Sequence, residues 1–231
     1  MNETLQTTRI GSAGAIDTQR NRVLRNTYWL LALSLVPTVL GAWVGVTMGF
    51  SFFAGSPLIG FMLFMGIAFG FFFAIEKFKN SGVGVALLLG FTFFMGLMLS
   101  RLIGGVLGFS NGATLIGMAF GGTALVFFGM ATLATTIKRD LSSMGKWLTI
   151  GVVVLIAASL ANIWLQLPAL MLTVSALAIV IFSAFMLYDI KRVIDGGETN
   201  YVTATLAIYL SVFNVFQSLL SLLGIFGGER D

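Results

Sequence analysis

Seven long apolar stretches dominate this chain and limit what it can fold into. They cover approximately residues 28–50, 57–75, 82–100, 113–137, 147–165, 169–188 and 203–226. A helix of about 20 residues spans the ~30 Å hydrocarbon core of a bilayer, and it satisfies its own backbone hydrogen bonds there. The sequence therefore predicts an all-α membrane protein with seven transmembrane helices.

The composition agrees with lipid as the solvent. Hydrophobic residues make up 58% of the 231 residues and charged residues only 10%, whereas soluble domains are about half apolar and about a quarter charged. The chain has no cysteine and no histidine, which excludes disulfides, thiolate nucleophiles and the usual zinc sites. We expect no metal site and no cofactor. The bilayer is the expected partner, and nucleic acid is not, because the basic residues lie in short connectors.

The basic residues are divided unequally between the two sides of the predicted bundle. If the N-terminus is cytoplasmic, eleven of them fall on the cytoplasmic side and two on the other. The eleven are Arg9, Arg20, Arg22, Arg25, Lys77, Lys79, Lys138, Arg139, Lys146, Lys191 and Arg192, and the two are Arg101 and Arg230. Cytoplasmic loops are enriched in Lys and Arg. We therefore predict a polar cytoplasmic N-terminal tail (1–26), a transmembrane domain (27–226) and a short extracytoplasmic C-terminal tail (227–231).

Glycines recur at four-residue spacing in three of the apolar stretches. The rows are Gly41, Gly45 and Gly49; Gly66 and Gly70; and Gly117 and Gly121. Rows of small residues let helix backbones approach closely in lipid. We expect all three rows to pack against neighbouring helices.

The last apolar stretch carries a polar stripe. Ser211, Asn214, Ser218 and Ser221 are spaced by three and four residues, which places them on one face of a helix. Polar side chains are costly toward lipid, so we expect this helix to be central. The stripe then faces either other helices, as interhelical hydrogen bonds, or a wet cavity.

Asp189 is the acidic residue that most deserves a functional interpretation. It ends the sixth apolar stretch, and acids at membrane depth are rare and usually functional. One interpretation is a gate or proton-sensitive lock at the cytoplasmic mouth. The alternative is a solvated acid at a helix end, paired with Lys77, Lys79, Lys191 or Arg192.

Two patterns typical of enzymes are present but incomplete. Residues 108–112 match a nucleophile-elbow string, but that motif needs a strand-to-helix turn and a base, and the chain has no histidine. Tyr188-Asp189 resembles half of an intramembrane aspartyl protease, which needs a second aspartate in the next helix. The seventh stretch contains no acid. We therefore expect a protein that is not an enzyme.

Several short motifs together resemble the Bax inhibitor-1 family and, within it, the bacterial YccA-like branch. They are Arg25–Tyr28, Gly121–Phe128, Lys138–Ser142, Ala161–Pro168, Tyr188–Asp189, Gly196–Tyr201 and Tyr209–Gly224. The resemblance covers approximately residues 20–226. It implies a seven-helix fold in which the last helix is surrounded by the other six.

The resemblance also implies two candidate functions. The YccA-like branch implies a regulator of an FtsH-type membrane AAA+ protease and its associated membrane partners, in membrane protein quality control at the bacterial inner membrane. The polar tail would be the segment that the protease engages. Other family members imply a pH-influenced leak for calcium or other cations, with two sensor aspartates on the sixth and seventh helices. The first maps onto Asp189, whereas the second position is Ser211 here.

Overall fold

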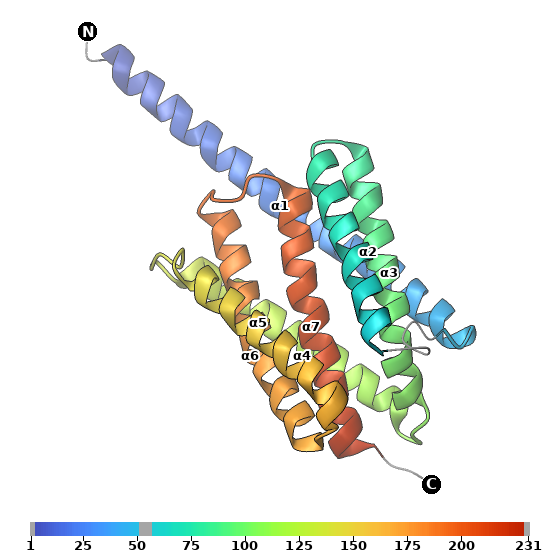
Figure 1. The fold of residues 1–231 in the computed structure, drawn as a ribbon. Helices are drawn as coiled ribbons and strands as arrows, with labels where there is room; N and C mark the ends of the chain where they lie inside the picture. The colour runs from blue at the N-terminus through green and yellow to red at the C-terminus, as the bar shows by residue number, and fades with distance from the viewer. Residues whose placement is uncertain (1–2, 51–56, 229–231) are drawn as a thin grey trace.

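The protein is a bundle of seven α-helices (Figure 1). The computed structural model describes the backbone of residues 3–50 and 57–228, and the side chains of residues 19–50 and 58–228. The helices are α1 (Glu3–Thr47), α2 (Pro57–Phe78), α3 (Gly82–Leu107), α4 (Gly112–Thr136), α5 (Met144–Leu165), α6 (Pro168–Ile194) and α7 (Tyr201–Gly227). Each contains a stretch long and apolar enough to cross a membrane. The predicted all-α fold with seven spans is confirmed.

The α5–α6 connection is the tightest turn in the bundle, and its residues explain how it closes. Gln166 ends α5 in the left-handed conformation, with φ at 50°. The carboxamide oxygen of Asn162 accepts the backbone N–H of Leu167 at 2.9 Å. Pro168 then begins α6, where the missing N–H costs nothing. Two apolar helices can therefore form a hairpin with almost no loop.

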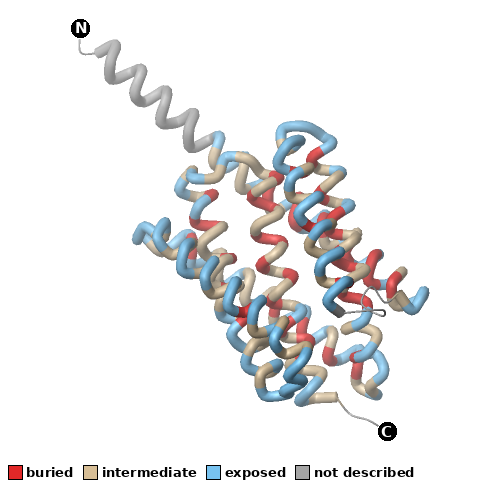
Figure 2. Tube along the Cα trace, in the orientation of Figure 1, coloured by how far each residue is buried: buried red, intermediate tan, exposed pale blue. Residues whose placement is uncertain are grey.

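Helix α7 occupies the centre of the bundle, as the polar stripe predicts. It packs against α1, α2, α3, α4 and α6, whereas α5 packs on the outside of α6. Buried residues run along α7, while α5 is exposed along most of its length (Figure 2). The ring around α7 thus consists of five helices in direct contact and a sixth that joins through α6.

Glycines let α1 and α3 touch backbone to backbone. A Cβ added at Gly96 of α3 would lie 2.1 Å from the carbonyl oxygen of Thr38 in α1. A Cβ at Gly41 of α1 would lie 2.1 Å from the carbonyl oxygen of Phe93 in α3. No side chain fits at either distance, so glycine is required at both positions by the close approach itself.

The other glycine rows do not pack, so that expectation is wrong for them. A Cβ added at Gly66, Gly70, Gly117 or Gly121 would meet no atom within 4 Å. Gly49 lies in the turn after α1 with φ at +62° and also has open space around it. Four-residue spacing shows that residues share a helix face, but it does not show whether that face meets another helix or lipid.

The N-terminal polar segment does not form a separate element. The backbone of α1 is helical from Glu3, and its membrane-spanning part begins at Gln19. At the other end, α7 stops at Gly227, and residues 229–231 lie outside the described part of the chain.

We expect Gly96→Ala to destabilise the protein because its new methyl group must push Thr38 and the α1 backbone away. Overpacking of this kind typically costs about 1–3 kcal/mol. Thermal unfolding in detergent would measure it. Gly70→Ala is the matched control, since its methyl group meets only open space. Equal midpoints for the two variants would contradict the α1–α3 contact.

Candidate functional site

The α6–α7 turn (residues 195–200) joins three parts of the bundle at the end where most basic residues lie, here called the basic end. The side-chain oxygen of Asn200 accepts the backbone N–H groups of Val202 at 2.9 Å and Thr203 at 3.2 Å, which caps α7. Its amide group donates to the carbonyl oxygen of Lys79 at 3.2 Å and to the side-chain oxygen of Asn80 at 2.8 Å. Asn200 therefore caps α7 and fastens it to the α2–α3 turn.

Both acids of the α6–α7 turn are neutralised by the last turn of α6. Lys191 lies 2.6 Å from a carboxylate oxygen of Asp195, and Arg192 lies 3.6 Å from one of Glu198. Lys191 is buried although it is charged, and a buried charge is costly unless it is paired. These pairs fix the turn against α6.

Asp189 precedes Lys191 by two residues and Arg192 by three on α6, and its side chain is partly buried. Arg192 and Glu198 are the charged groups that act on it electrostatically. Those two groups also pair with each other. Within residues 19–50 and 58–228, no basic side chain lies within 4 Å of the Asp189 carboxylate, and no hydrogen bond to it is formed.

Two lysines considered as partners for Asp189 make other contacts. Lys79, in the α2–α3 turn, forms an ion pair with Glu76 near the end of α2. The ammonium group of Lys77 lies 5.5 Å from the centroid of the Phe78 ring. Of the basic residues proposed from the sequence, Arg192 is the one that acts on Asp189 across space.

The polar stripe of α7 faces the interior. Ser211, Ser218 and Ser221 are buried. Ser211 donates to the carbonyl oxygen of Ala207 at 3.3 Å, and the amide of Asn214 donates to that of Leu210 at 2.8 Å. These bonds stay within α7. In the part of the chain that the structure describes, no hydrogen bond joins Ser211 to Asp189.

A second polar cluster, between α7, α1 and α3, was missed by the sequence analysis. The hydroxyl groups of Tyr209 and Thr38 share a hydrogen bond of 2.8 Å. Thr38 also donates to the carbonyl oxygen of Ser34 at 2.9 Å, and Tyr209 lies 3.5 Å from that of Thr92. All four residues are buried. The hydroxyl residues of the first span were the available signal, but their spacing does not identify a partner on α7.

Two motifs far apart in sequence meet at the basic end. Asp140, in the α4–α5 turn, accepts hydrogen bonds from the Ser142 hydroxyl at 2.5 Å and its backbone N–H at 2.8 Å. These bonds, with a smaller contribution from Lys191, hold the pKa of the Asp140 carboxyl below its usual range. Nearby, a Cβ added at Gly145 would lie 2.8 Å from the Tyr188 ring. The start of α5, directly after this turn, therefore lies against the α6 segment that carries Asp189.

We expect Asn200→Ala to lower stability by about 0.5–2 kcal/mol, the usual cost of losing a helix cap. Asn200→Asp keeps the acceptor oxygen but cannot donate to Lys79 and Asn80, so an intermediate loss is expected. Thermal unfolding, with hydrogen exchange of the α2–α3 turn, measures both effects. Thr199→Ala is the control at an exposed neighbouring position. Wild-type behaviour of Asn200→Asp would show that the tie to α2–α3 contributes nothing.

Comparison with known proteins gives a consistent result across the chain. The family model described as Inhibitor of apoptosis-promoting Bax1 matches residues 20–228. The Modulator of FtsH protease YccA of Escherichia coli K12 is 40% identical over 211 residues, covering 91% of this chain and 92% of that protein. An uncharacterised protein of Neisseria meningitidis serogroup A is 39% identical over 212 residues, covering 91% and 93%. An uncharacterised Pseudomonas aeruginosa protein is 38% identical over 220 residues, covering 95% and 96%.

The matched region contains all seven apolar spans apart from the first residue of α1's span. The similarity to YccA extends over nearly the whole length of both chains, so it concerns the complete bundle. A second E. coli relative with the same identity and coverage is called Inner membrane protein YccA, which agrees with a bacterial inner membrane location. With seven helices in total, α7 at their centre, and this family match over residues 20–228, the chain belongs to the Bax inhibitor-1 family.

Proposed function

We propose that this protein modulates an FtsH-type AAA+ protease in membrane protein quality control, with its N-terminus in the cytoplasm. The observation that carries the proposal is the 40% identity, over nearly full length, to a protein named as a modulator of FtsH protease. The eleven-to-two distribution of basic residues supports the orientation. No residue of the protein is assigned a catalytic role.

The arrangement of α1 supports a specific way of acting. The helix begins at Glu3, but its membrane-spanning part begins at Gln19, so a polar segment precedes the bilayer. A protease that pulls on this segment must extract α1 first. Yet α1 is held by the Gly41 and Gly96 contacts with α3 and by the Thr38–Tyr209 hydrogen bond with α7. We infer that the protein is engaged readily and processed slowly, and so competes with other clients.

We expect overproduction of this protein to lengthen the half-life of a membrane client of the protease, measured by pulse-chase. Deletion of residues 2–18 should remove the effect, because the protease loses its point of engagement. Gly96→Ala should weaken it, because a loosened α1 is extracted faster, whereas the control Gly70→Ala should not. An unchanged client half-life, together with failure to co-purify the protease from native membranes, would refute the proposal.

A calcium or other cation leak is the second candidate. Two observations favour it. Asp189 is partly buried and has no basic partner within 4 Å among the described residues. The neighbouring helix α7 carries a polar stripe that faces the interior. The stripe has Ser211 where a second sensor acid would be needed. We therefore propose the leak as an accessory activity that depends on Asp189.

For the leak, we expect Asp189→Asn to abolish calcium flux into proteoliposomes. Ser211→Asp should sharpen the pH dependence of flux, because two neighbouring carboxylates share a proton. Asp140→Asn, an exposed acid outside the spans, is the control and should leave flux unchanged. Absence of flux in the parent protein, or equal flux with Asp189→Asn, would refute this second candidate.

A further inference from the structure

Arg20 occupies an unusual position among the basic residues of the basic end. It lies at the start of the membrane-spanning part of α1. Its guanidinium donates to the backbone carbonyl oxygen of Asp195 at 3.0 Å, beside Gly196, whose φ is +79°. Among the residues with described side chains, no carboxylate lies within 4 Å of it. Within the described part of the chain, the Arg20 guanidinium is thus held by a neutral carbonyl group and not by a carboxylate.

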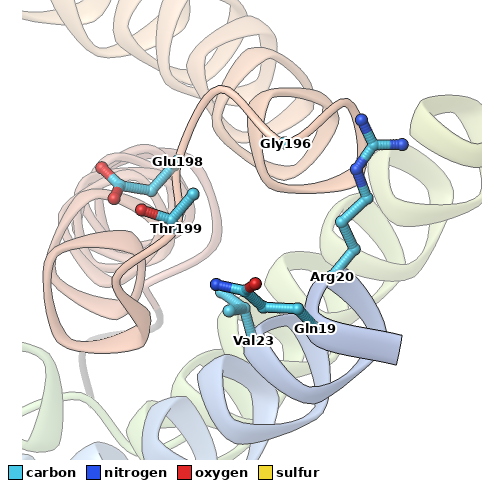
Figure 3. Close-up of a pocket in the computed structure, with 6 residues that line it drawn as sticks. All are labelled: Gln19, Arg20, Val23, Gly196, Glu198 and Thr199. Carbon is cyan, nitrogen blue, oxygen red and sulfur yellow. The ribbon is translucent and has the colours of Figure 1, made fainter. Parts of the chain in front are cut away.

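Among the residues with described side chains, the two acids of the α6–α7 turn beside Arg20 are already paired with other basic residues. Asp195 pairs with Lys191, and Glu198 pairs with Arg192. Figure 3 shows Arg20 extending from α1 toward Gly196, with the Glu198 carboxylate on the far side of the turn and directed away from the space between them. Among the described residues, Arg20 therefore bonds to a neutral carbonyl, has no unpaired acid beside it, and lines an open hollow at the surface.

A groove of about 290 Å³ opens beside Arg20 and is lined by Arg20, Asn21, Leu24 and Ile194. It lies between the first turns of the α1 span and the last residue of α6, which are both at the edge of the apolar region. Arg20 and Leu24 are four residues apart, so they share one face of α1 and are separated by ~6 Å along its axis. The groove is thus charged on its water side and apolar on its membrane side.

This order of groups matches that of a phospholipid at the membrane surface. The phosphate of a lipid lies at the interface and its acyl chains lie below, as Arg20 and Asn21 lie above Leu24, with Ile194 as the apolar wall of the groove on α6. Guanidinium groups bind phosphate oxygens with two parallel hydrogen bonds, and basic pockets between transmembrane helices bind anionic headgroups. We propose that the groove between α1 and α6 binds the headgroup of an anionic phospholipid through Arg20.

Binding of lipids by the purified full-length protein tests this proposal. Native mass spectrometry would compare phosphatidylglycerol with phosphatidylethanolamine of the same acyl chains. We expect preferential binding of phosphatidylglycerol, and about fivefold weaker binding with Arg20→Gln, the loss expected for one interfacial cation. Arg22→Gln is the control, because it removes the same charge at a similar depth from the opposite face of α1. Equal loss in both variants would overturn the proposal in favour of general attraction to a basic surface.

A second variant guards against a folding defect in Arg20→Gln. Asn21→Asp places a negative charge in the groove at an exposed position and leaves the Arg20–Asp195 bond in place. It should weaken phosphatidylglycerol binding with an unchanged unfolding midpoint, and unchanged binding would overturn the proposal. Addition of glycerol 3-phosphate tests whether the groove binds the phosphate of a lipid headgroup or a free, soluble phosphate. Competition at equal concentration would show a soluble-phosphate site instead of a lipid site. No protease is present, so the outcome is independent of the proposed regulatory function.

Discussion

Thr38 lies where three helices of the bundle meet, and the contacts around it set the relative positions of α1, α3 and α7. Its backbone carbonyl faces Gly96, which lets α3 approach to contact distance. Its hydroxyl group shares a hydrogen bond with Tyr209 on α7. In lipid, apolar side chains gain little by leaving the solvent, so close packing and hydrogen bonds between helices provide most of the attraction. Thr38 supplies both the close packing against α3 and the hydrogen bond to α7.

The helices differ in how strongly they are attached to this centre. Helix α7 buries residues along its length, whereas α5 has Leu155 as its buried residue and packs on α6. The outward glycines of α2 and α4 contribute nothing to packing within the chain. A force applied at the N-terminus would act on α1, which meets α3 backbone to backbone at Gly41 and Gly96 and bonds to α7 through Thr38, and the proposed slow processing requires such an attachment.

The sequence was sufficient to predict the features that depend on composition along one helix. Span lengths follow from bilayer thickness, and the central place of α7 follows from the cost of turning Ser211, Ser218 and Ser221 toward lipid. Features that depend on two helices were harder to predict. The row containing Gly41 and Gly45 packs and the row containing Gly66 and Gly70 does not, although the spacing is identical. The Tyr209–Thr38 bond joins residues 171 positions apart, and no periodicity connects them.

The candidate site could be located from the sequence, but its chemistry depends on tertiary contacts. Asp189 was recognised as an acid at membrane depth, yet the groups that act on it come from the next helical turn and from the α6–α7 turn. The stripe on α7 was expected to need partners on other helices or water. Ser211 and Asn214 instead bond to carbonyl oxygens of their own helix. Polar groups satisfied in this way can be buried at modest cost. An inward polar stripe is therefore consistent with a closely packed core, and it does not require a water-filled path through the bundle.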